Sequence, residues 1–211
     1  MADNVFLNLN ELEKSAKAMA PYILNPRKFI EAFVMISKKD GSFGKMKLNK
    51  AQRLVMDEIE RRMANNMPVR IRILKSRQQG ATALCVALGM WWACCHENAS
   101  YAVVAHKETS ASSIYDRARM IYNNLPRELK PMTSKFNSER IFFDGNGGEI
   151  QGLRSRVFFG TAGGGELFRG ETINFLHKSE KAFWDDANGV LDKSLNATVP
   201  KLPNTFIIDE T

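Results

Sequence analysis

Residues 75–82 carry cationic, glycine and hydroxyl side chains in a spacing typical of a loop that binds phosphate. The segment reads KSRQQGAT, and it lies between an apolar strand and a long apolar helix. A glycine at such a strand-to-helix turn lets backbone N–H groups and the helix N-terminus surround phosphate oxygens, and Gly80 can fill that place. The Thr82 hydroxyl, within the first turn of the helix, is placed to reach Mg²⁺. The residues predicted to contact phosphate are Lys75, Arg77, Gln78, Gln79, Gly80, Ala81 and Thr82, with Thr82 also predicted to contact the metal.

The predicted loop departs from the usual phosphate-loop pattern at two positions. Ala81 stands where the pattern has its lysine, and Lys75 stands where it has its first glycine. A cation is still needed to neutralise the outer phosphates, so either Lys75 or Arg77 must supply it. We therefore interpret the loop as a variant whose cation has moved to its other end. The alternative is an ordinary strand-turn-helix with solvated cations.

A second group of candidate residues follows the apolar segment Ile173–His177. Phosphate-loop ATPases place the groups that hold Mg²⁺ and orient the attacking water at the end of such a strand. Glu180 is predicted to orient the water. Ser179 occupies the place of the usual Asp, and its hydroxyl can hydrogen-bond a water of the Mg²⁺ shell. The alternative is a surface Glu that merely follows a strand.

Two further side chains are candidates for the same site. Gln52 lies in the first turn of a predicted helix shortly before the loop strand, and its amide can pair with the N6 and N7 edge of adenine. The alternative is a solvated glutamine. Arg169 lies between Gly163–Gly165 and Gly170, which suits an arginine that reaches a neighbouring subunit's nucleotide.

The role predicted for Arg169 has competing explanations. Arg154 and Arg156 are rivals for it, and Arg169 could instead pair within its own subunit or be solvated.

Composition limits the kinds of protein that the chain can be. Its 211 residues fit one large domain, or one domain with a small lid. The net charge of +7 indicates a polyanionic partner. No apolar run is long enough to cross a membrane, and we expect no signal peptide. The three cysteines lie on the helix after the loop without zinc-site spacing, which predicts buried thiols in a reducing compartment.

Strands alternate with helices along most of the chain, which predicts a mainly parallel sheet between helices. Residues 1–40 are predicted to be helical, including a helix over Pro26–Phe33. A helix capped by Thr109 or Ser110 follows the second strand, and a glycine-rich hairpin joins residues 141–143 to 157–159. The remaining predicted elements are strands over residues 69–74, 101–105, 173–177 and 205–208 and a helix over residues 81–95.

Taken together, these segments resemble the ATPase domain of the large terminase of tailed bacteriophages. The resemblance is carried by Leu48–Gln52, Lys75–Thr82, Phe168–Gly170 and His177–Trp184, and it covers roughly residues 45–211. Asp209–Thr211 is similar to the start of the family's coupling motif, which makes Thr211 a candidate coupling residue. The family's nuclease domain has no counterpart in this sequence, so we expect the chain to be a truncated ATPase half.

The resemblance implies a fold, a function and a set of partners. The fold is an additional-strand phosphate-loop ATPase, with a helical lid over residues 1–66 and an ATPase core over residues 67–211. The function is Mg²⁺-dependent ATP hydrolysis that translocates double-stranded DNA into a procapsid. The partners are the portal protein and the small terminase subunit, with a homo-oligomeric ring when assembled and a monomer in isolation. The implied location is the host cytoplasm, transiently docked on the procapsid.

Two other functional classes stay open. A non-packaging ATPase or helicase would require single-stranded nucleic acid for stimulation. A catalytically inactive module that docks DNA or a capsid protein would bind no nucleotide.

Overall fold

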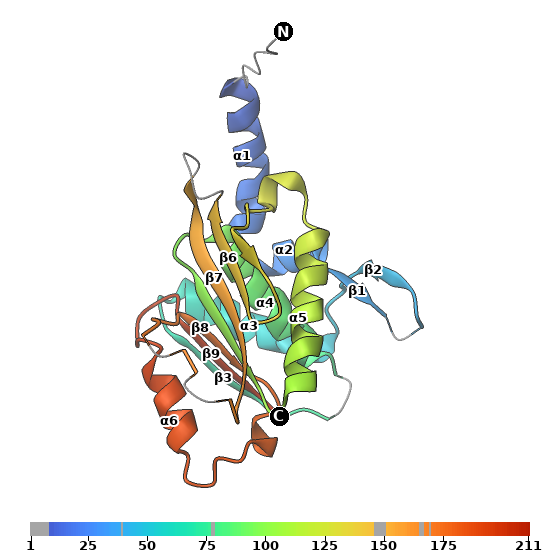
Figure 1. Ribbon diagram of the computed structural model, residues 1–211. Coiled ribbons are helices and arrows are strands. Elements are labelled where there is room, and N and C mark those ends of the chain that lie inside the picture. The colour runs from blue at the N-terminus through green and yellow to red at the C-terminus, as the bar shows by residue number, and fades with distance from the viewer. Residues whose placement is uncertain (1–8, 39, 77–78, 146–150, 165–166, 169) are drawn as a thin grey trace.

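A seven-stranded sheet forms the centre of the protein (Figure 1). The computed structural model describes residues 9–38, 40–76, 79–145, 151–164, 167–168 and 170–211. The strand order is β3-β9-β8-β4-β7-β6-β5, and the first five strands in this order pair in parallel. The last two add an antiparallel extension. The strands are β3 (Val69–Ile73), β4 (Ser100–Ala105), β5 (Lys135–Phe136), β6 (Arg140–Gly145), β7 (Gln151–Thr161), β8 (Phe175–Lys178) and β9 (Phe206–Glu210).

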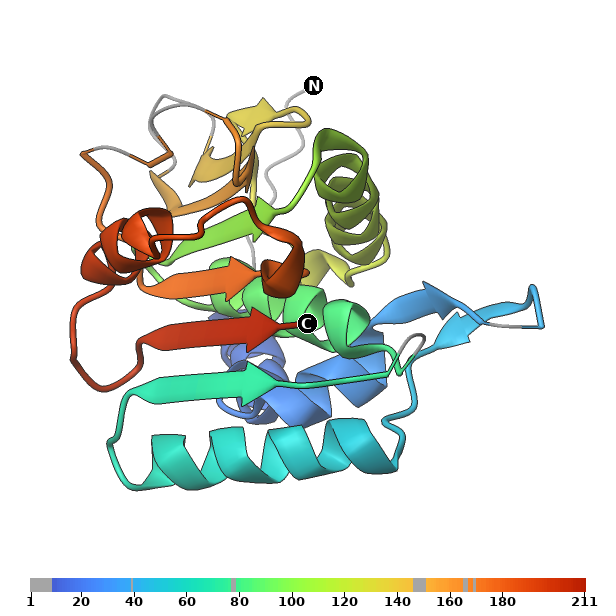
Figure 2. The same ribbon diagram turned by 90° about the horizontal axis from the view of Figure 1, so that it is seen from below.

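Strand β9 separates the strand that enters the predicted phosphate loop from the strand that ends at the predicted catalytic Glu. It pairs with β3 on one side and with β8 on the other, in parallel with both. This is the additional strand that the sequence analysis predicted. Because parallel strands end at one edge, the residues that follow β3, β8 and β9 meet there, as Figure 2 shows.

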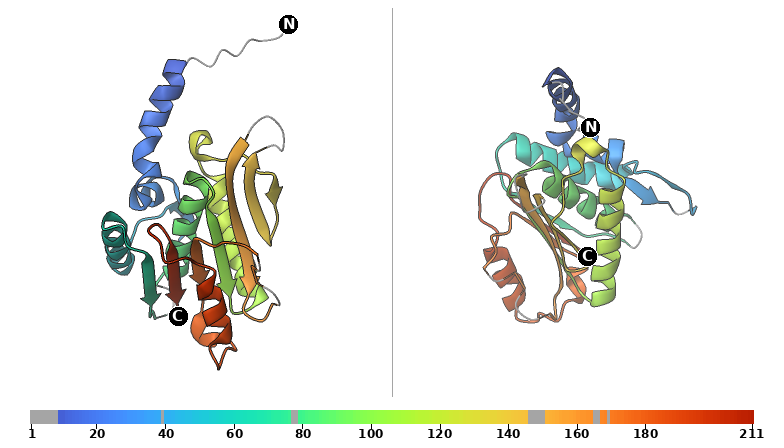
Figure 3. Two further views of the ribbon diagram at one scale, coloured as in Figure 1. Left: turned by 90° about the vertical axis from the view of Figure 1, so that its left-hand side faces the viewer. Right: turned by 45° about the horizontal axis from the view of Figure 1, so that its top comes forward.

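Helices cover both faces of the sheet (Figures 1 and 2). One face carries α4 and α5, with α2 packed on α4 and α3 beside β3, and the other face carries α6. The N-terminal helix α1 points away from the body of the protein, as Figure 3 shows. The helices are α1 (Leu9–Ile23), α2 (Pro26–Phe33), α3 (Lys50–Ala64), α4 (Ala81–Cys95), α5 (Glu108–Asn123) and α6 (Val190–Ala197), with 3₁₀ turns η1 (Arg127–Leu129) and η2 (Lys181–Phe183).

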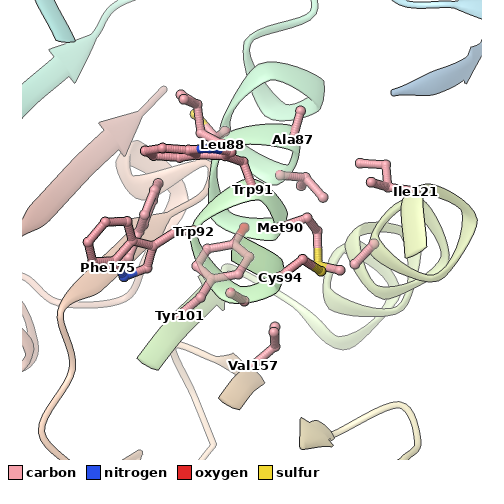
Figure 4. Packing of buried hydrophobic residues seen from close by; sticks show 14 of the residues in the cluster. Ala87, Leu88, Met90, Trp91, Trp92, Cys94, Tyr101, Ile121, Val157 and Phe175 are labelled. Atoms are coloured by element: carbon pink, nitrogen blue, oxygen red, sulfur yellow. The ribbon is translucent and has the colours of Figure 1, made fainter. Parts of the chain in front are cut away.

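Helix α4 is the centre of the larger hydrophobic core (Figure 4). Its residues are apolar all round, as expected for a helix buried on every side. Trp92 packs toward Phe175 and Met90 faces α5, while Trp91 donates its ring N–H to the carbonyl of Ile23 at the end of α1. At Gly89 a Cβ would lie 2.2 Å from the Tyr101 ring, so this glycine allows α4 to approach β4 closely. This packing fixes the start of α4, and therefore the phosphate loop, against the sheet.

Charged residues are buried on the α6 face. The Lys178 side chain is 1% exposed; its ammonium group donates to Asp192 and Asn196 and lies 2.7 Å from Asp209 Oδ1. Lys181 bridges the same two carboxylates. A buried charge is tolerated only with such partners, so this network holds α6 to the ends of β8 and β9.

The predicted helix α2, helix α4 and hairpin β6–β7 are confirmed, whereas two predictions at element boundaries are wrong. The N-terminal region is not wholly helical, because β1 (Met35–Ser37) and β2 (Phe43–Lys45) form an antiparallel hairpin. Helix α5 begins at Glu108 with Lys107 at the cap position, so neither Thr109 nor Ser110 caps it. Residues of α2 and of the segment after the hairpin share one core cluster with α4. The domain boundary at residue 66 stays a prediction.

Within the described residues no helix is long and apolar enough to span a membrane.

Candidate nucleotide-binding site

The candidate phosphate loop turns at Gly80, where α4 begins. Gly80 has φ +74° and ψ +19°, a left-handed conformation that favours glycine. Ala81 is then the first helical residue, and its side chain is buried. The N-terminus of α4 therefore faces the carboxyl edge of the sheet, where its free N–H groups and positive dipole end can receive an anion. Arg77 and Gln78, two of the predicted phosphate contacts, lie outside the described residues.

Helix α3 holds this loop in place through two side chains. Gln52 Nε2 donates to the Gly80 carbonyl at 2.8 Å, and Asn49 Nδ2 donates to the Gln79 carbonyl at 3.0 Å. Gln52 and Asn49 also form a reciprocal capping box at the start of α3. The buried Gln52 amide thus anchors the loop, a role that sequence reasoning missed. Its predicted adenine contact is untested.

We expect Gln52→Ala to weaken both the fold and the loop. The substitution leaves the Gly80 carbonyl and the Asn49 N–H without this partner, which should lower the free energy of unfolding by about 1–3 kcal/mol. Denaturant unfolding measures that change, with the exposed α3 residue Lys50 replaced by Ala as the control. Unchanged unfolding would contradict the anchoring role. Equal losses of ATP and GTP affinity would indicate anchoring alone, whereas a selective loss for ATP would indicate an adenine contact.

A cavity of about 240 Å³ lies at the start of α4 and brings together three residues predicted from separate segments: Thr82, Ser179 and Glu180. Thr109, Ser110, Ser113, Ile114 and Arg117 of α5 form the rest of its wall. The distant segments 75–82 and 178–180 therefore share one site.

Glu180 is held in a specific position within this cavity. Its backbone has φ +52° and ψ +41°, which is unusual for a residue with a side chain. Its Oε2 lies 2.6 Å from His106 Nδ1 and accepts from the Ser110 hydroxyl at 3.2 Å. His106 directly follows β4, the strand beside β8. These contacts orient a half-exposed carboxylate at the end of β8.

A second cavity, of about 610 Å³, is lined in part by Gln79 and Gly80 of the loop. Its wall includes Ile36 of the β1–β2 hairpin, Gln52 of α3 and Gly80 of the loop, and it shares Arg117 with the smaller cavity. The remaining lining residues are Ser37, Lys38, Met46, Lys47, Asn49, Gln79 and Ala83. Two cavities that meet at Arg117 can receive the two ends of one ligand. Sequence reasoning missed both the hairpin and Arg117; the only signal for Arg117 was its place beside Ile114 and Ala118 in a predicted helix.

Lys75 contacts the last residue of β9 and the residue after it. Its Nζ lies 3.7 Å from Glu210 Oε2, and its side chain is 18% exposed. The backbone of Thr211 accepts from Lys75 N and donates to the Ile73 carbonyl, and the Thr211 hydroxyl accepts from Ala182 N at 3.1 Å. The predicted coupling residue therefore connects the start of the phosphate loop to the turn that follows Glu180.

Glu210 lies fully buried behind Ser179, one of the residues that line the smaller cavity. Ser179 Oγ donates to its Oε1 at 2.7 Å, and His177 Nε2 lies 3.3 Å from the same oxygen. Burial alone would raise the pKa of Glu210, but the contacts with His177, Ser179 and Thr82 outweigh it and bring the pKa to about 2. Glu210 is therefore an anion at neutral pH.

The oxygen-rich donor set of the smaller cavity fits Mg²⁺. Thr82 and Ser179 offer hydroxyls and Glu180 offers a carboxylate, which are hard ligands of the kind that Mg²⁺ accepts directly or through water. Among the described residues, one group of potential ligands containing a thiol and an imidazole also converges: Cys85, His177 and Glu210 place ligand atoms within 4.8 Å of one another. Glu210 is engaged there by Ser179, so we assign this buried group to the support of Glu210.

Of the arginines considered for action on a neighbouring subunit, the structure describes Arg154 and Arg156, and neither lines the two cavities. Arg169 lies outside the described residues. Arg154 lies 3.6 Å from Glu97, and Arg156 lies 3.6 Å from Glu171. Arg156 pairs with Ser100 at the start of β4, five residues before the pair Ala105–Thr161, so it lies roughly 17 Å along the sheet from the carboxyl edge.

The strand order and the turn at Gly80 define an additional-strand phosphate-loop fold. Comparison with solved structures shows which proteins share this arrangement. The chain matches the crystal structure of the HK97 bacteriophage large terminase with a TM-score of 0.65 at 15% identity, over 90% of this chain and 37% of that one. It matches the ATPase domain of the Thermus phage P74-26 large terminase with a TM-score of 0.56 at 16% identity, over 78% of this chain and 65% of that one. An Arg-to-Ala mutant of the same domain matches with a TM-score of 0.56 at 14% identity. The chain therefore has the fold of large terminase ATPase domains, as the sequence resemblance predicted.

Comparisons based on sequence add no relative. No protein-family model matches the chain, and no curated protein matches it. The matched region spans less than two thirds of each solved chain.

Proposed function

We propose that this chain is the ATPase motor domain of a viral large terminase, which hydrolyses ATP to translocate double-stranded DNA into a procapsid. The observation that supports the proposal most strongly is the cavity of about 240 Å³ lined by Thr82, Ser179 and Glu180. A loop hydroxyl, a polar residue after the strand and a carboxylate are the groups that phosphate-loop ATPases gather around the terminal phosphate.

Each residue has a distinct role in the proposed reaction. The N–H groups at the start of α4 bind phosphate oxygens, and Lys75 supplies the cation that Ala81 cannot. Glu180 accepts the proton of the attacking water, positioned by His106 and Ser110. Mg²⁺, held by Thr82 and by Ser179 through water, would neutralise charge on the outer phosphates. Arg169 is proposed to contact a neighbouring subunit's nucleotide, and Thr211 to couple the loop to the turn after Glu180.

The base of the nucleotide is assigned to the larger cavity. Its lining combines apolar Ile36 and Met46 with the amide of Gln52, which suits a planar base with a polar edge. Arg117, at the junction of both cavities, is placed to contact the phosphate chain between them.

We extend the proposal to the partners of the chain. The net charge of +7 favours binding to DNA, and the portal protein and small terminase subunit follow from the terminase-like fold. A homo-oligomeric ring would form on the procapsid in the host cytoplasm, with the isolated domain as a monomer.

The direct test is phosphate release from ATP by the purified protein, alone and with nucleic acid. The proposal predicts slow Mg²⁺-dependent turnover that double-stranded DNA stimulates more than single-stranded DNA. A preference for single-stranded nucleic acid would favour a helicase. Failure to bind any nucleotide would indicate a docking module.

We expect His106→Ala to slow hydrolysis without weakening ATP binding. The substitution removes a short contact that orients Glu180, and one hydrogen bond of about 1.5 kcal/mol corresponds to roughly a tenfold fall in kcat. Calorimetry and single-turnover rates separate binding from chemistry, with the exposed α5 residue Ser112 replaced by Ala as control. An unchanged rate would show that Glu180 needs no orientation by His106.

A further inference from the structure

The residue after β8 lacks the carboxylate that phosphate-loop ATPases use near Mg²⁺. Those enzymes hold the metal with the loop Ser or Thr and an Asp at the end of the acidic strand. Here the corresponding residue is Ser179, whose hydroxyl is too short to replace both oxygens of a carboxylate. The Ser179 hydroxyl instead donates to a buried carboxylate at 2.7 Å, that of Glu210.

Strand register explains why this carboxylate comes from β9. Lys178 is paired with Asp209, so the next residues, Ser179 and Glu210, are neighbours across the two strands. Alternation along the strands turns Lys178 and Asp209 toward α6 and turns the next pair toward α4. Neighbouring strands lie about 4.8 Å apart, so a longer side chain on β9 can reach the point that an Asp on β8 would occupy.

Glu210 also lies beside the cation of the proposed site. Its Oε2 lies 3.7 Å from Lys75 Nζ. Among the described residues, Oε2 has no hydrogen-bond partner although it is fully buried. His177 lies on the interior side, against Oε1. One anion therefore lies behind two side chains assigned to phosphate and metal, Lys75 and Ser179.

We propose that Glu210 is the positioning carboxylate of the Mg²⁺ site. It supplies from β9 the negative charge that an Asp at the position of Ser179, after β8, would supply. It fixes the hydroxyl of Ser179 toward the metal shell and places Lys75 beside the phosphates. This inference rests on the proposed ATPase function and deepens it. It also distinguishes Glu210 from its neighbour Asp209, which stabilises the fold by pairing with Lys178 and Lys181.

The test is the factor by which Mg²⁺ tightens ATP binding, measured by calorimetry with Mg²⁺ and with a chelator. Losing a partner that orients metal ligands costs about 10–100-fold in metal affinity, so Glu210→Gln should reduce the tightening by that factor. Asp209→Asn is the matched control, because it alters the adjacent carboxylate on the opposite face. It should lower stability but leave the tightening unchanged.

A second variant separates positioning from a structural role. Ser179→Asp combined with Glu210→Gln returns the carboxylate to β8 while keeping a polar group on β9, and it should recover the Mg²⁺ effect. A folded double variant that recovers nothing, or a folded Glu210→Gln protein with full tightening, would overturn the inference. Absence of any Mg²⁺-dependent ATP binding in the wild type would instead overturn the proposed function.

A measurement on the wild type covers the case in which Glu210→Gln does not fold. The anomalous signal of Mn²⁺ bound with a non-hydrolysable ATP analogue locates the metal in a crystal. The inference predicts that a hydroxyl of Ser179 or Thr82, or a water, links the metal to Glu210. A metal with no such link to Glu210 would overturn it.

Discussion

Glu180→Gln should bind ATP with nearly wild-type affinity and hydrolyse it about 10²–10⁴-fold more slowly. The amide keeps the size of the side chain and can still contact His106 and Ser110. It cannot accept a proton from water, so the loss should fall on the chemical step. The half-exposed position of Glu180 on the cavity wall makes this substitution compatible with the fold.

Single-turnover hydrolysis and calorimetric binding of ATP distinguish the possible outcomes for this variant. The exposed Glu128 in η1 gives the matched control, since Glu128→Gln removes a carboxylate far in sequence from the site. Normal turnover by Glu180→Gln would assign water activation to another group. Loss of ATP binding would identify Glu180 as a structural residue.

Lys75→Ala should weaken ATP binding by about 10–150-fold, which corresponds to the 1.5–3 kcal/mol of a charged hydrogen bond. Ala81 leaves the usual lysine position without a cation, and Lys75 Nζ lies 3.7 Å from Oε2 of Glu210, the last residue of β9. Hydrolysis should fall further than binding, because charge on the transferred phosphoryl group spreads in the transition state.

The loss must be separated from a change in folding, because Lys75→Ala removes a cation next to a buried carboxylate. Thermal unfolding of the variant provides that check, and Lys193→Ala on α6 is the control for loss of one exposed positive charge. Lys75→Arg keeps the charge and should retain part of the affinity. Wild-type binding and turnover in a folded Lys75→Ala protein would exclude Lys75 from the phosphate site.

The elements that sequence predicted well are those with strong local signals. Pro26 at the first helical position and the capping Asn25 define α2 without reference to the rest of the chain. The apolar run of α4 is bounded by Gly80, whose positive φ fits the turn that precedes it. The β1–β2 hairpin was missed because its strands are three residues long and carry little apolar alternation.

The parts of the site that sequence did not reveal depend on long-range register and packing. The pairing of β8 with β9 decides that Glu210 meets Ser179, and no pattern within either segment records it. The contact between His106 and Glu180 likewise joins residues 74 positions apart. Sequence predicted a nucleotide contact for Gln52, but its hydrogen bond to the Gly80 carbonyl depends on the packing of α3 beside the loop.

A crystal structure of the Glu180→Gln protein grown with Mg²⁺ and ATP tests the central claim most directly. The account predicts the γ-phosphate in the cavity lined by Thr82, Ser179 and Glu180, with the cation of Lys75 beside it and the base in the cavity that includes Gln52 and Ile36. ATP bound elsewhere on the protein, or no bound nucleotide at saturating ATP, would contradict it.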